Sequence, residues 1–512
     1  MTAKVSGRIV EGRAIDRDLR LEADACVIGS GAGGAVVARR LAEGGMTVVV
    51  LEEGPWVRTR EFVRDEAESR LRLYRNGGFR ASADGNLVVL EGRCVGGSTV
   101  VGMGTAMPAP GKVLERWVEK SGVPDLSPAG LADHFGRVAR ELSVAPVPDA
   151  MINPNNRAIR RGAERLGLSH DVLPRAVKGC AGCGRCAQGC PTGAKRSMMV
   201  TLLPKALRAG ATLYADARAD AVLLSGGRVR GVRGVILDRE SRRRSWSIEV
   251  SAPVVVAAAG AIESPLLLQR SRVPGRSMLI GANLRVNPSV PVMGIVEEPV
   301  HGYLGIPQSV GSARFADLRD GKGGYTLEGD FAGAASVGSL LPGFGLAHKR
   351  LLARYRFMGL VSVVLQDDST GDVRVRRGAD REIHYELGKA DRGKLLEGIR
   401  QAAVLMFRAG AHKVFAGPRT NAILDAETYL VQLDRPDVRE IPLRMTATRP
   451  QGTCRMGADP SQSVTDPNGQ VHGTRGLFVA DASLFPGALG VPPQMTVMAL
   501  AARTAEAILV SR

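Results

Sequence analysis

The sequence ACVIGSGAGG at residues 25–34 is the most informative stretch about the fold, because it joins an apolar strand to a helix through a glycine-rich turn. Four consecutive apolar residues at 25–28 predict a buried strand, and the apolar residues at 35–41 predict the helix. Gly29, Gly31 and Gly34 have the spacing G-x-G-x-x-G. In such a turn the first glycine permits the tight bend, the second admits a pyrophosphate, and the third lets the helix pack on the strand. The helix N-terminus would then hold the pyrophosphate.

An acidic residue stands where this unit needs one. A second apolar strand at 47–51 ends in Glu52, which is 18 residues after Gly34. At this position an acid accepts hydrogen bonds from the ribose of an adenosine. A G-x-G-x-x-G run alone can arise by chance in a glycine-rich chain. Here the strand, the helix and the spaced acid agree, so we expect a dinucleotide-binding unit at the start of the chain.

Length and composition indicate a large globular protein. The 512 residues suggest two to four domains at roughly 100–200 residues each. Apolar residues make up 44% and charged residues 23%, which excludes a disordered chain. The net charge of +18 could indicate a nucleic-acid binder. The arginines are interleaved with acids, as at 239–244, and no nucleic-acid motif occurs. We therefore expect a solvated basic surface and no nucleic-acid partner.

The sequence also predicts where the protein resides. Residues 1–20 are charged throughout and lack the apolar core of a secretory signal. The longest clean apolar run, near 252–262, is about half the length that a bilayer crossing requires. We expect no transmembrane segment and a cytoplasmic location. Seven cysteines, four of them within eleven residues, favour a metal site over a secreted disulfide framework.

The coarse order of elements predicts an α/β protein with two parts. After the first unit we expect a charged helical region at 57–90, a glycine-rich loop at 91–108, helices at 110–145 and an irregular segment at 150–200. Short strands at 207–238 and a buried strand at 250–258 come next. An antiparallel sheet with helices is expected at 285–440, and a final strand and helix at 477–480 and 496–509. The final strand and helix return to the α/β pattern of the start. This return predicts one discontinuous cofactor domain.

Three further motifs extend the pattern along the chain. They are GRCVGGST at 92–99, GAIESP at 260–265, and the pair GLFVADAS at 476–483 and TVMALA at 496–501. With the first turn, this ordered set resembles the glucose–methanol–choline (GMC) family of flavin oxidoreductases over nearly the whole chain. The resemblance is strongest to the bacterial branch similar to long-chain alcohol oxidases and dehydrogenases. It implies an FAD-dependent oxidation of an alcohol CH–OH group by hydride transfer to the flavin.

The resemblance implies a fold and a domain division. It predicts a doubly wound, Rossmann-like FAD domain and a second, mainly antiparallel substrate domain. The FAD domain would take residues 1–145, 196–290 and 441–512, the substrate domain 291–440, and a cysteine-bearing loop at 146–195 would cover the site.

The resemblance also assigns cofactor-binding residues. It implies that the ADP half is held by Gly29, Gly31, Gly34 and Glu52, and that the isoalloxazine and the pyrophosphate are approached by Gly96, Gly97 and Ser98. It further implies that Ala261 lies near the adenine and that Asp481 binds the ribityl chain. Thr496 is assigned to the same site. A helix-capping role is the alternative for Asp481. Some family members attach FAD covalently through a His in the loop at 94–102; this loop has none, so we expect non-covalent FAD.

The chain departs from the family where the catalytic residues should be. Arg449 stands at the position of the family's proton-accepting His, and Pro492 stands where Asn is usual. Gln494 is the remaining polar residue of that second segment. Because Arg does not lose its proton in a protein, Arg449 is a poor base. It could bind a carboxylate or stabilise the negative charge of reduced flavin.

Three functions therefore stay open. One is oxidation of a CH–OH group with an unusual base. Another is different flavin chemistry on a carboxylate-bearing or apolar substrate. The last is a flavin-binding subunit without turnover. Three histidines come into question as a substitute base, namely His301, His348 and His472, although each is expected to be an ordinary surface or loop residue.

The cysteine cluster has its own alternatives. Cys180, Cys183, Cys186 and Cys190 have the spacing C-x2-C-x2-C-x3-C-P of bacterial ferredoxins. Some membrane-linked FAD dehydrogenases that the chain resembles carry an iron–sulfur cluster on such a segment. A cluster would pass electrons singly to an acceptor protein or a quinone. Zinc on four thiolates and a metal-free loop over the flavin are the alternatives.

The remaining cysteines and one apolar stretch complete the sequence-based expectations. Cys26, Cys94 and Cys454 are interpreted as small packing residues. The apolar, glycine-rich stretch at 331–346 suggests a hydrophobic, membrane-delivered substrate, or else simply buried core.

Overall fold

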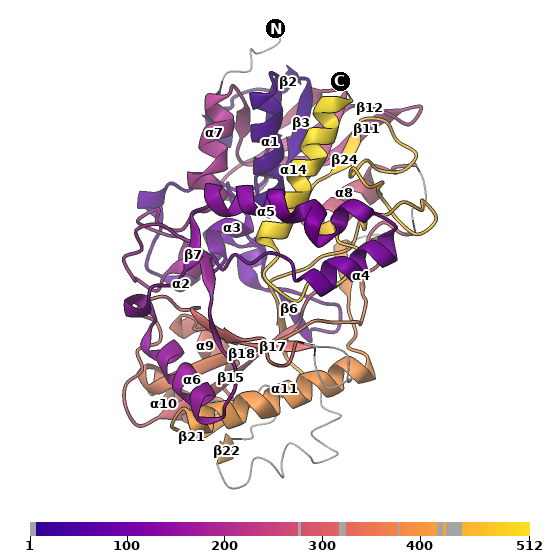
Figure 1. The fold of residues 1–512 in the computed structure, drawn as a ribbon. Coiled ribbons are helices and arrows are strands. Elements are labelled where there is room, and N and C mark those ends of the chain that lie inside the picture. The colour runs from indigo at the N-terminus through magenta and orange to yellow at the C-terminus, as the bar shows by residue number, and fades with distance from the viewer. Residues whose placement is uncertain are drawn as a thin grey trace.

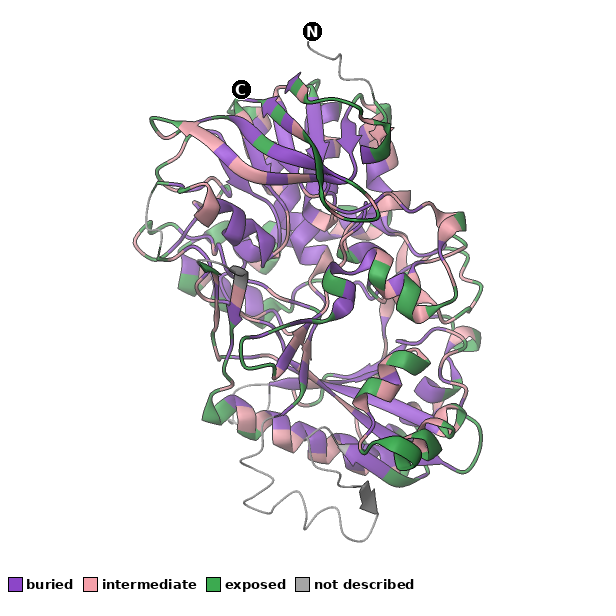
Figure 2. Ribbon diagram, turned by 180° about the vertical axis from the view of Figure 1, so that it is seen from behind, coloured by how far each residue is buried: buried purple, intermediate pink, exposed green. Residues whose placement is uncertain are grey.

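The computed structural model describes residues 7–274, 278–316, 324–376, 379–416, 423–425 and 443–511. The chain forms two halves, each built around a sheet, and both termini lie at the same end of the molecule (Figure 1). Buried residues fill the sheets of both halves, whereas exposed residues gather on loops and outer helices (Figure 2). Residues 317–323, 377–378, 417–422 and 426–440 of the predicted substrate domain lie outside the described residues.

A six-stranded parallel sheet forms the half that holds the termini. Its order is β1 (Ile9–Val10), β10 (Thr212–Tyr214), β4 (Val48–Leu51), β3 (Ala25–Ile28), β14 (Val254–Ala257) and β24 (Leu477–Val479). Strands from the start, the middle and the end of the chain are thus neighbours. The strands β4, β3, β14 and β24 read as continuous apolar runs because a parallel sheet is covered on both faces.

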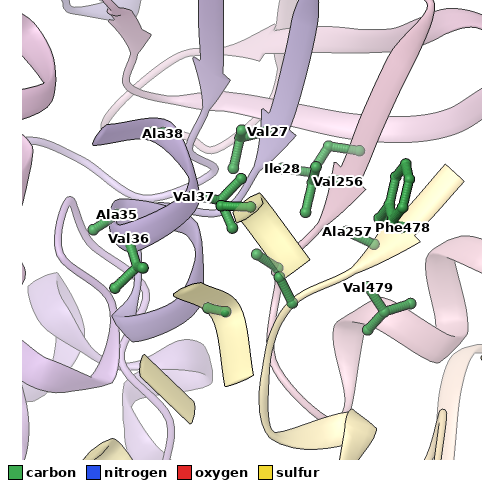
Figure 3. Close-up of a cluster of buried hydrophobic side chains, with 14 of the residues drawn as sticks. Val27, Ile28, Ala35, Val36, Val37, Ala38, Val256, Ala257, Phe478 and Val479 are labelled. Carbon is green, nitrogen blue, oxygen red and sulfur yellow. The ribbon is translucent and has the colours of Figure 1, made fainter. Parts of the chain in front are cut away.

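Two helices from opposite ends of the chain cover this sheet together. α1 (Ala32–Glu43) packs against α14 (Gln494–Val510), and α7 (Leu202–Arg208) packs beside α1. Figure 3 shows part of this core, with Val37 of α1 beside Val27 of β3 and Phe478 of β24 beside Ala257 of β14. This packing fixes the glycine turn between β3 and α1 against the end of β24.

A small sheet extends the first half. It has the order β11 (Ala217–Ser225), β12 (Arg228–Leu237), β13 (Arg244–Ser251) and β2 (Leu19–Glu22). The helices α4 (Gly111–Ser121), α5 (Pro128–Glu141) and α8 (Glu263–Arg270) complete this half.

A ten-stranded mixed sheet forms the other half. Eight of its strands follow one another in the order β5 (Arg80–Ala81), β6 (Leu87–Val89), β23 (Met445–Ala447), β15 (Ser289–Val296), β18 (Met358–Leu365), β17 (Tyr325–Gly329), β16 (Val310–Ser312) and β8 (Asp171–Val172). The other two branch from this order: β21 (Ala411–Ala416) pairs with β15, and β22 (Ile423–Asp425) pairs with β21. Most of its pairings are antiparallel. The long helix α11 (Lys389–Arg408) crosses its outer face (Figure 1).

Shorter elements surround this second sheet. They are α2 (Glu66–Leu73), α3 (Ser98–Val101), α6 (Pro154–Arg165), α9 (Ala334–Leu340), α10 (Gly345–Leu352), and the pairs β7 (Val144–Pro146) with β9 (Pro174–Ala176) and β19 (Asp372–Arg376) with β20 (Ala379–His384). The α/β class with a Rossmann-like half and a second, mainly antiparallel half agrees with the prediction. The exact domain limits stay a prediction.

Local predictions failed in three places. The region 57–90 is not one helical region, because α2 ends before Tyr74 and the left-handed residues Asn76 and Gly77 turn the chain into β5 and β6. The loop at 91–108 contains α3. The segment 150–200 contains the helix α6, which Pro154 begins and the Asn153 side chain caps by accepting from the Asn156 N–H.

None of the helices in the described ranges combines the length and the apolar character that a bilayer crossing requires.

Candidate functional site

A cavity of about 1390 Å³ lies between the two halves. Its lining comes from both sheets: the turn at 29–33 and Asp481 on one side, and Ser289 of β15, Ser362 of β18 and Thr446 of β23 on the other. The dinucleotide turn and the segment around Arg449 therefore open into one space. A ligand held by the turn can reach the second sheet.

The glycine turn closes tightly for steric reasons. Gly29 has φ +99°, and a Cβ on Gly34 would collide with the carbonyl oxygen of Gly29. A Cβ on Gly97 would lie 2.9 Å from the Cα of Gly31, so the two glycine loops approach backbone to backbone. Gly29, Gly31 and Gly97 line the cavity, whereas Gly34 serves the packing of α1.

Glu52 holds the turn in place. One carboxylate oxygen accepts from the Ser30 N–H at 3.0 Å and from the Ser30 hydroxyl at 2.6 Å, and the other accepts from the Gly54 N–H at 2.8 Å. Burial raises the pKa of Glu52, and these hydrogen bonds oppose the rise. Glu52 lines the cavity at the predicted end of the second strand. The oxygen that accepts from Gly54 has a lone pair left for a ribose hydroxyl.

The second glycine loop is fixed from both sides. The Ser30 hydroxyl accepts from the Gly96 N–H at 2.9 Å, and the Ser98 hydroxyl accepts from the Gly92 N–H at 3.0 Å. Lys195 donates to the carbonyl oxygens of Val100, Gly102 and Cys186, each at 2.6 Å. Ser98 and Gly97 line the cavity, and Gly96 lies behind them.

Asp481 gathers donors at the end of the last strand. Its carboxylate accepts from the Gly260 N–H at 2.8 Å, the Ser264 hydroxyl at 2.5 Å and the Ser483 N–H at 2.8 Å. The last contact caps a short helical turn, so the capping alternative is part of its role. Burial raises the pKa of Asp481. Asp481 also lines the cavity and can still accept from a polyol there.

The two remaining cofactor residues differ in position. Ala261 lines the cavity, and its carbonyl oxygen accepts from the Thr453 hydroxyl at 2.5 Å. Thr496 is buried in the first turn of α14, and its hydroxyl has no hydrogen-bond partner in the described part of the chain. Whether these residues contact the cofactor stays a prediction.

Arg449 is buried in an ion pair that the sequence did not reveal. Its Nη2 donates to both carboxylate oxygens of Glu328, at 3.0 and 2.7 Å. Glu328 also accepts from Gln308 at 2.8 Å, and Gln308 accepts from the Thr105 hydroxyl at 2.5 Å. The other terminal nitrogen of Arg449 has no described partner. Pro492 and Gln494 line the same cavity.

Asp330 adds a carboxyl group that forms no ion pair with any described residue. It follows β17, lines the cavity and is partly exposed to solvent. Its carboxylate accepts from the Phe331 N–H at 2.8 Å. Burial raises the pKa of Asp330 to about 7; nearby Glu328 adds to the rise, while Arg449 and Arg175 oppose it. Two carboxylates with different partners therefore lie beside Arg449, and neither carried a recognisable sequence motif.

The three candidate histidines lie outside the cavity lining. His301 contacts the Tyr303 hydroxyl at 2.7 Å, His348 contacts the Gly338 carbonyl at 2.8 Å, and His472 contacts the Ser463 hydroxyl at 2.9 Å. These contacts agree with ordinary structural roles.

The clustered cysteines do not converge on a metal. In the described ranges no group of three or more His, Cys, Asp or Glu side chains is placed to hold an ion. The Cys186 sulfur accepts from Arg175 at 3.3 Å, while the Cys190 sulfur accepts from the Lys195 N–H at 3.3 Å. Cys183, Arg185 and Gln188 line the cavity, so this segment forms part of its wall.

The other three cysteines are buried, and burial raises their thiol pKa values, as expected of small packing residues.

Comparisons with known proteins agree with this arrangement. Residues 71–289 and 367–501 match the N-terminal and C-terminal sequence profiles of the GMC oxidoreductases. A GMC-type oxidoreductase of Sinorhizobium fredii is 32% identical over 97% of both chains. A GMC-type oxidoreductase of Mycobacterium tuberculosis is 34% identical over 94% of this chain and 75% of that protein.

A long-chain-alcohol oxidase of Arabidopsis thaliana, FAO3, is 28% identical over 94% of this chain and 67% of that protein. Among solved structures, pyridoxine 4-oxidase from Mesorbium loti has a TM-score of 0.71 at 20% identity and covers 94% of this chain and 98% of its own. The last likeness concerns the fold alone. Together, the sequence matches and the two-sheet arrangement show that this chain is a member of the GMC oxidoreductase family, an FAD-dependent oxidoreductase.

Proposed function

We propose that this chain oxidises the CH–OH group of an apolar alcohol and that non-covalent FAD accepts the hydride. The observation that supports this most is the shared cavity, which the dinucleotide turn and the residues around Arg449 line together. The homologous long-chain-alcohol oxidases support an alcohol substrate. Apolar lining residues such as Phe331, Leu340 and Leu360 suit a hydrocarbon chain.

The residues present fit FAD. The glycine turn leaves backbone N–H groups at the start of α1 for the pyrophosphate. Glu52 and Asp481 are buried acceptors at the ends of two strands of the same sheet, suited to the ribose and the ribityl hydroxyls. The Thr496 hydroxyl is an unpartnered buried group among the described residues, in the first turn of α14 next to Val497, which lines the cavity. When bound, FAD supplies the hydride acceptor.

We assign Asp330 as the base that accepts the proton of the substrate hydroxyl group. A base must be deprotonated at working pH and still bind a proton well, and its pKa near 7 meets both needs. Glu328 is less suited, because Arg449 and Gln308 already use its oxygens. Arg449 cannot accept a proton, but its free Nη1 can donate a hydrogen bond to the substrate oxygen.

A carboxylate-bearing substrate is less favoured than an alcohol. An arginine clamp uses two parallel N–H groups toward the ligand. Glu328 already neutralises Arg449 and occupies one of its terminal nitrogens. A second carboxylate would meet the negative charge of Glu328 at close range. The same argument disfavours a free cation beside the flavin, which the sequence had suggested.

An iron–sulfur cluster is not part of the proposal. The ferredoxin-like spacing is its sole support, and the four thiols do not converge. The metal-free alternative, a loop that closes the cavity, is supported by the lining residues of this segment. The electron acceptor of the second half-reaction is left open between oxygen, a quinone and a protein. The cytoplasmic location stays a prediction.

Anaerobic mixing with alcohols of increasing chain length tests the function. We expect the visible band of oxidised flavin to bleach, and to bleach faster with longer chains. A flavoprotein that no alcohol bleaches would contradict the proposal and favour the subunit without turnover.

A further inference from the structure

Unusually exposed apolar side chains lie at the mouth of the cavity. Phe79 is 74% exposed and Leu304 is 50% exposed, yet both line the cavity. A residue can do both only where the cavity reaches the surface. The opening is therefore bordered by apolar groups from two segments that are far apart in the sequence.

The α9–α10 hairpin continues this apolar border outward. Ser336 and Leu340 of α9 line the cavity, and the Ser336 hydroxyl accepts from Arg70 of α2 at 2.8 Å. Beyond α9, Phe344 is 91% exposed and Leu346 is 64% exposed. Figure 1 shows α2, α9 and α10 on the same side of the molecule. Other apolar residues of the same stretch, namely Phe331, Val337 and Leu341, are buried. The exposure of Phe344 and Leu346 is therefore a feature of these two positions and not of the whole stretch.

The hairpin is also purely basic. Residues 331–366, all of them described, contain no Asp or Glu. The exposed residues Lys349, Arg350, Arg354 and Arg356 lie within ten residues after Leu346, and none forms an ion pair with another described residue. Arg354 and Arg356 lie over the ring of Phe357, which leaves their charges unneutralised. The acids of neighbouring α2 are already engaged: Glu66 accepts from the Ala335 and Ser336 N–H groups at the start of α9 and pairs with Arg70, and Glu68 pairs with Arg72. Apolar tips beside cations without a described counter-ion are complementary to an anionic lipid surface.

We propose that this docking rim, formed by Leu304, Phe344, Leu346, Lys349, Arg350, Arg354 and Arg356, binds reversibly to the surface of an anionic lipid bilayer. Phe344 and Leu346 insert at the level of the headgroups, and the four cations contact lipid phosphates. The cavity mouth then faces the membrane, and an apolar alcohol enters from the lipid. This entry route rests on the proposed function, whereas the docking does not.

Co-flotation with vesicles tests the docking without turnover. The flavin-loaded protein is mixed with vesicles of phosphatidylglycerol and phosphatidylcholine, and in parallel with phosphatidylcholine alone. We expect binding to the anionic vesicles and little binding to the neutral ones. Phe344→Ser with Leu346→Ser should weaken binding more than tenfold while flavin content stays unchanged. The matched control is Val510→Ser, because Val510 is also exposed and ends α14, which Figure 1 shows in the other half of the molecule from α9 and α10.

The charge contribution has a separate variant. Lys349→Gln with Arg350→Gln should weaken binding by about fivefold for each charge removed, and added salt should have a similar effect. Arg13→Gln, an exposed cation of the other half, should leave binding unchanged.

Three results would overturn the docking: no binding to anionic vesicles, equal binding of the Phe344→Ser/Leu346→Ser variant, or a dimer in the absence of lipid that this variant dissociates. If the variant fails to float but dissolved alcohols still bleach its flavin, docking is supported independently of the chemistry. If docking succeeds but no alcohol bleaches the flavin, the proposed function fails and the docking stands.

Discussion

Glu328 neutralises Arg449 inside the cavity, with the Arg449 Nη2 2.7 Å from one carboxylate oxygen and 3.0 Å from the other. Both side chains are buried, and they come from β17 and from the segment after β23. The ion pair thus joins a strand to the segment that follows another strand of the same sheet. The resemblance to the family implies that Arg449 stands at the position of the family's base. Under the proposed function the proton therefore goes to another group, and we assign it to Asp330, which forms no ion pair with any described residue.

Breaking this pair should destabilise the protein strongly. Glu328→Gln removes one charge and leaves Arg449 buried without its counter-ion, which costs about 3–5 kcal/mol in comparable pairs. Glu328→Gln combined with Arg449→Met should lose less than the single variant. Denaturant unfolding of the flavin-loaded protein measures both, with the exposed Arg350→Gln as control. A single variant as stable as the wild type would show that the pair does not form.

Replacement of Asp330 should change the pH dependence of catalysis. The base acts in its ionised form, so kcat/KM should rise with pH through an inflection near 7. Asp330→Asn should lower kcat by about 10²- to 10⁴-fold and remove this inflection. Asp171→Asn, at an exposed position of the same half, is the control. An unchanged pH profile in Asp330→Asn would exclude Asp330 as the base.

The same group should make the stability depend on pH. In the folded protein Asp330 holds its proton up to a pH near 7, whereas its ordinary pKa is 3.8. The folded state therefore binds more protons in between, and stability falls as the pH rises from about 4 through about 7. Asp330→Asn should match the wild type near pH 4 and be more stable at pH 8. Thermal unfolding at both pH values checks this; a variant less stable at pH 8 would contradict the raised pKa.

Glu52→Arg should remove the flavin. The substitution replaces an acceptor with a group that only donates, and it releases the Ser30 and Gly54 contacts that hold the turn. The ratio of visible to ultraviolet absorbance of the purified variant measures this loss. Glu53→Gln is the neighbouring control, since Glu53 pairs with Arg75 instead. Full flavin content in Glu52→Arg would refute the placement of the adenosine.

Denaturation should release the flavin from the protein, and the purified protein should contain no bound metal. Acid precipitation is expected to release FAD into the supernatant, because the loop at 94–102 has no His to bond it. Elemental analysis of anaerobically purified protein should find neither iron nor zinc in stoichiometric amount. A yellow pellet would show a covalent bond. Stoichiometric iron with acid-labile sulfide, lost in Cys180→Ser, would restore the iron–sulfur interpretation.

Local patterns predicted the FAD half well, because its strands are continuous apolar runs and its turns need glycine for steric reasons. Glu52 and Asp481 stand at strand ends, a position visible in sequence. Glu328, Asp330 and Lys195 escaped prediction, because their roles come from contacts across long sequence separations. Glu328 meets Arg449 over 121 residues, and Lys195 meets Val100 over 95. The cysteine spacing is the only support for an iron–sulfur cluster, and in the described ranges these thiols are not placed together to hold an ion.

Whether the protein oxidises an alcohol is decided by the anaerobic visible spectrum of the flavin-loaded protein, recorded while a long-chain primary alcohol is added. Oxidation of the CH–OH group predicts complete bleaching of the oxidised flavin band and formation of the corresponding aldehyde, with much slower bleaching in Asp330→Asn. A band that stays unchanged with every alcohol, in a protein whose flavin a chemical reductant still bleaches, would contradict it.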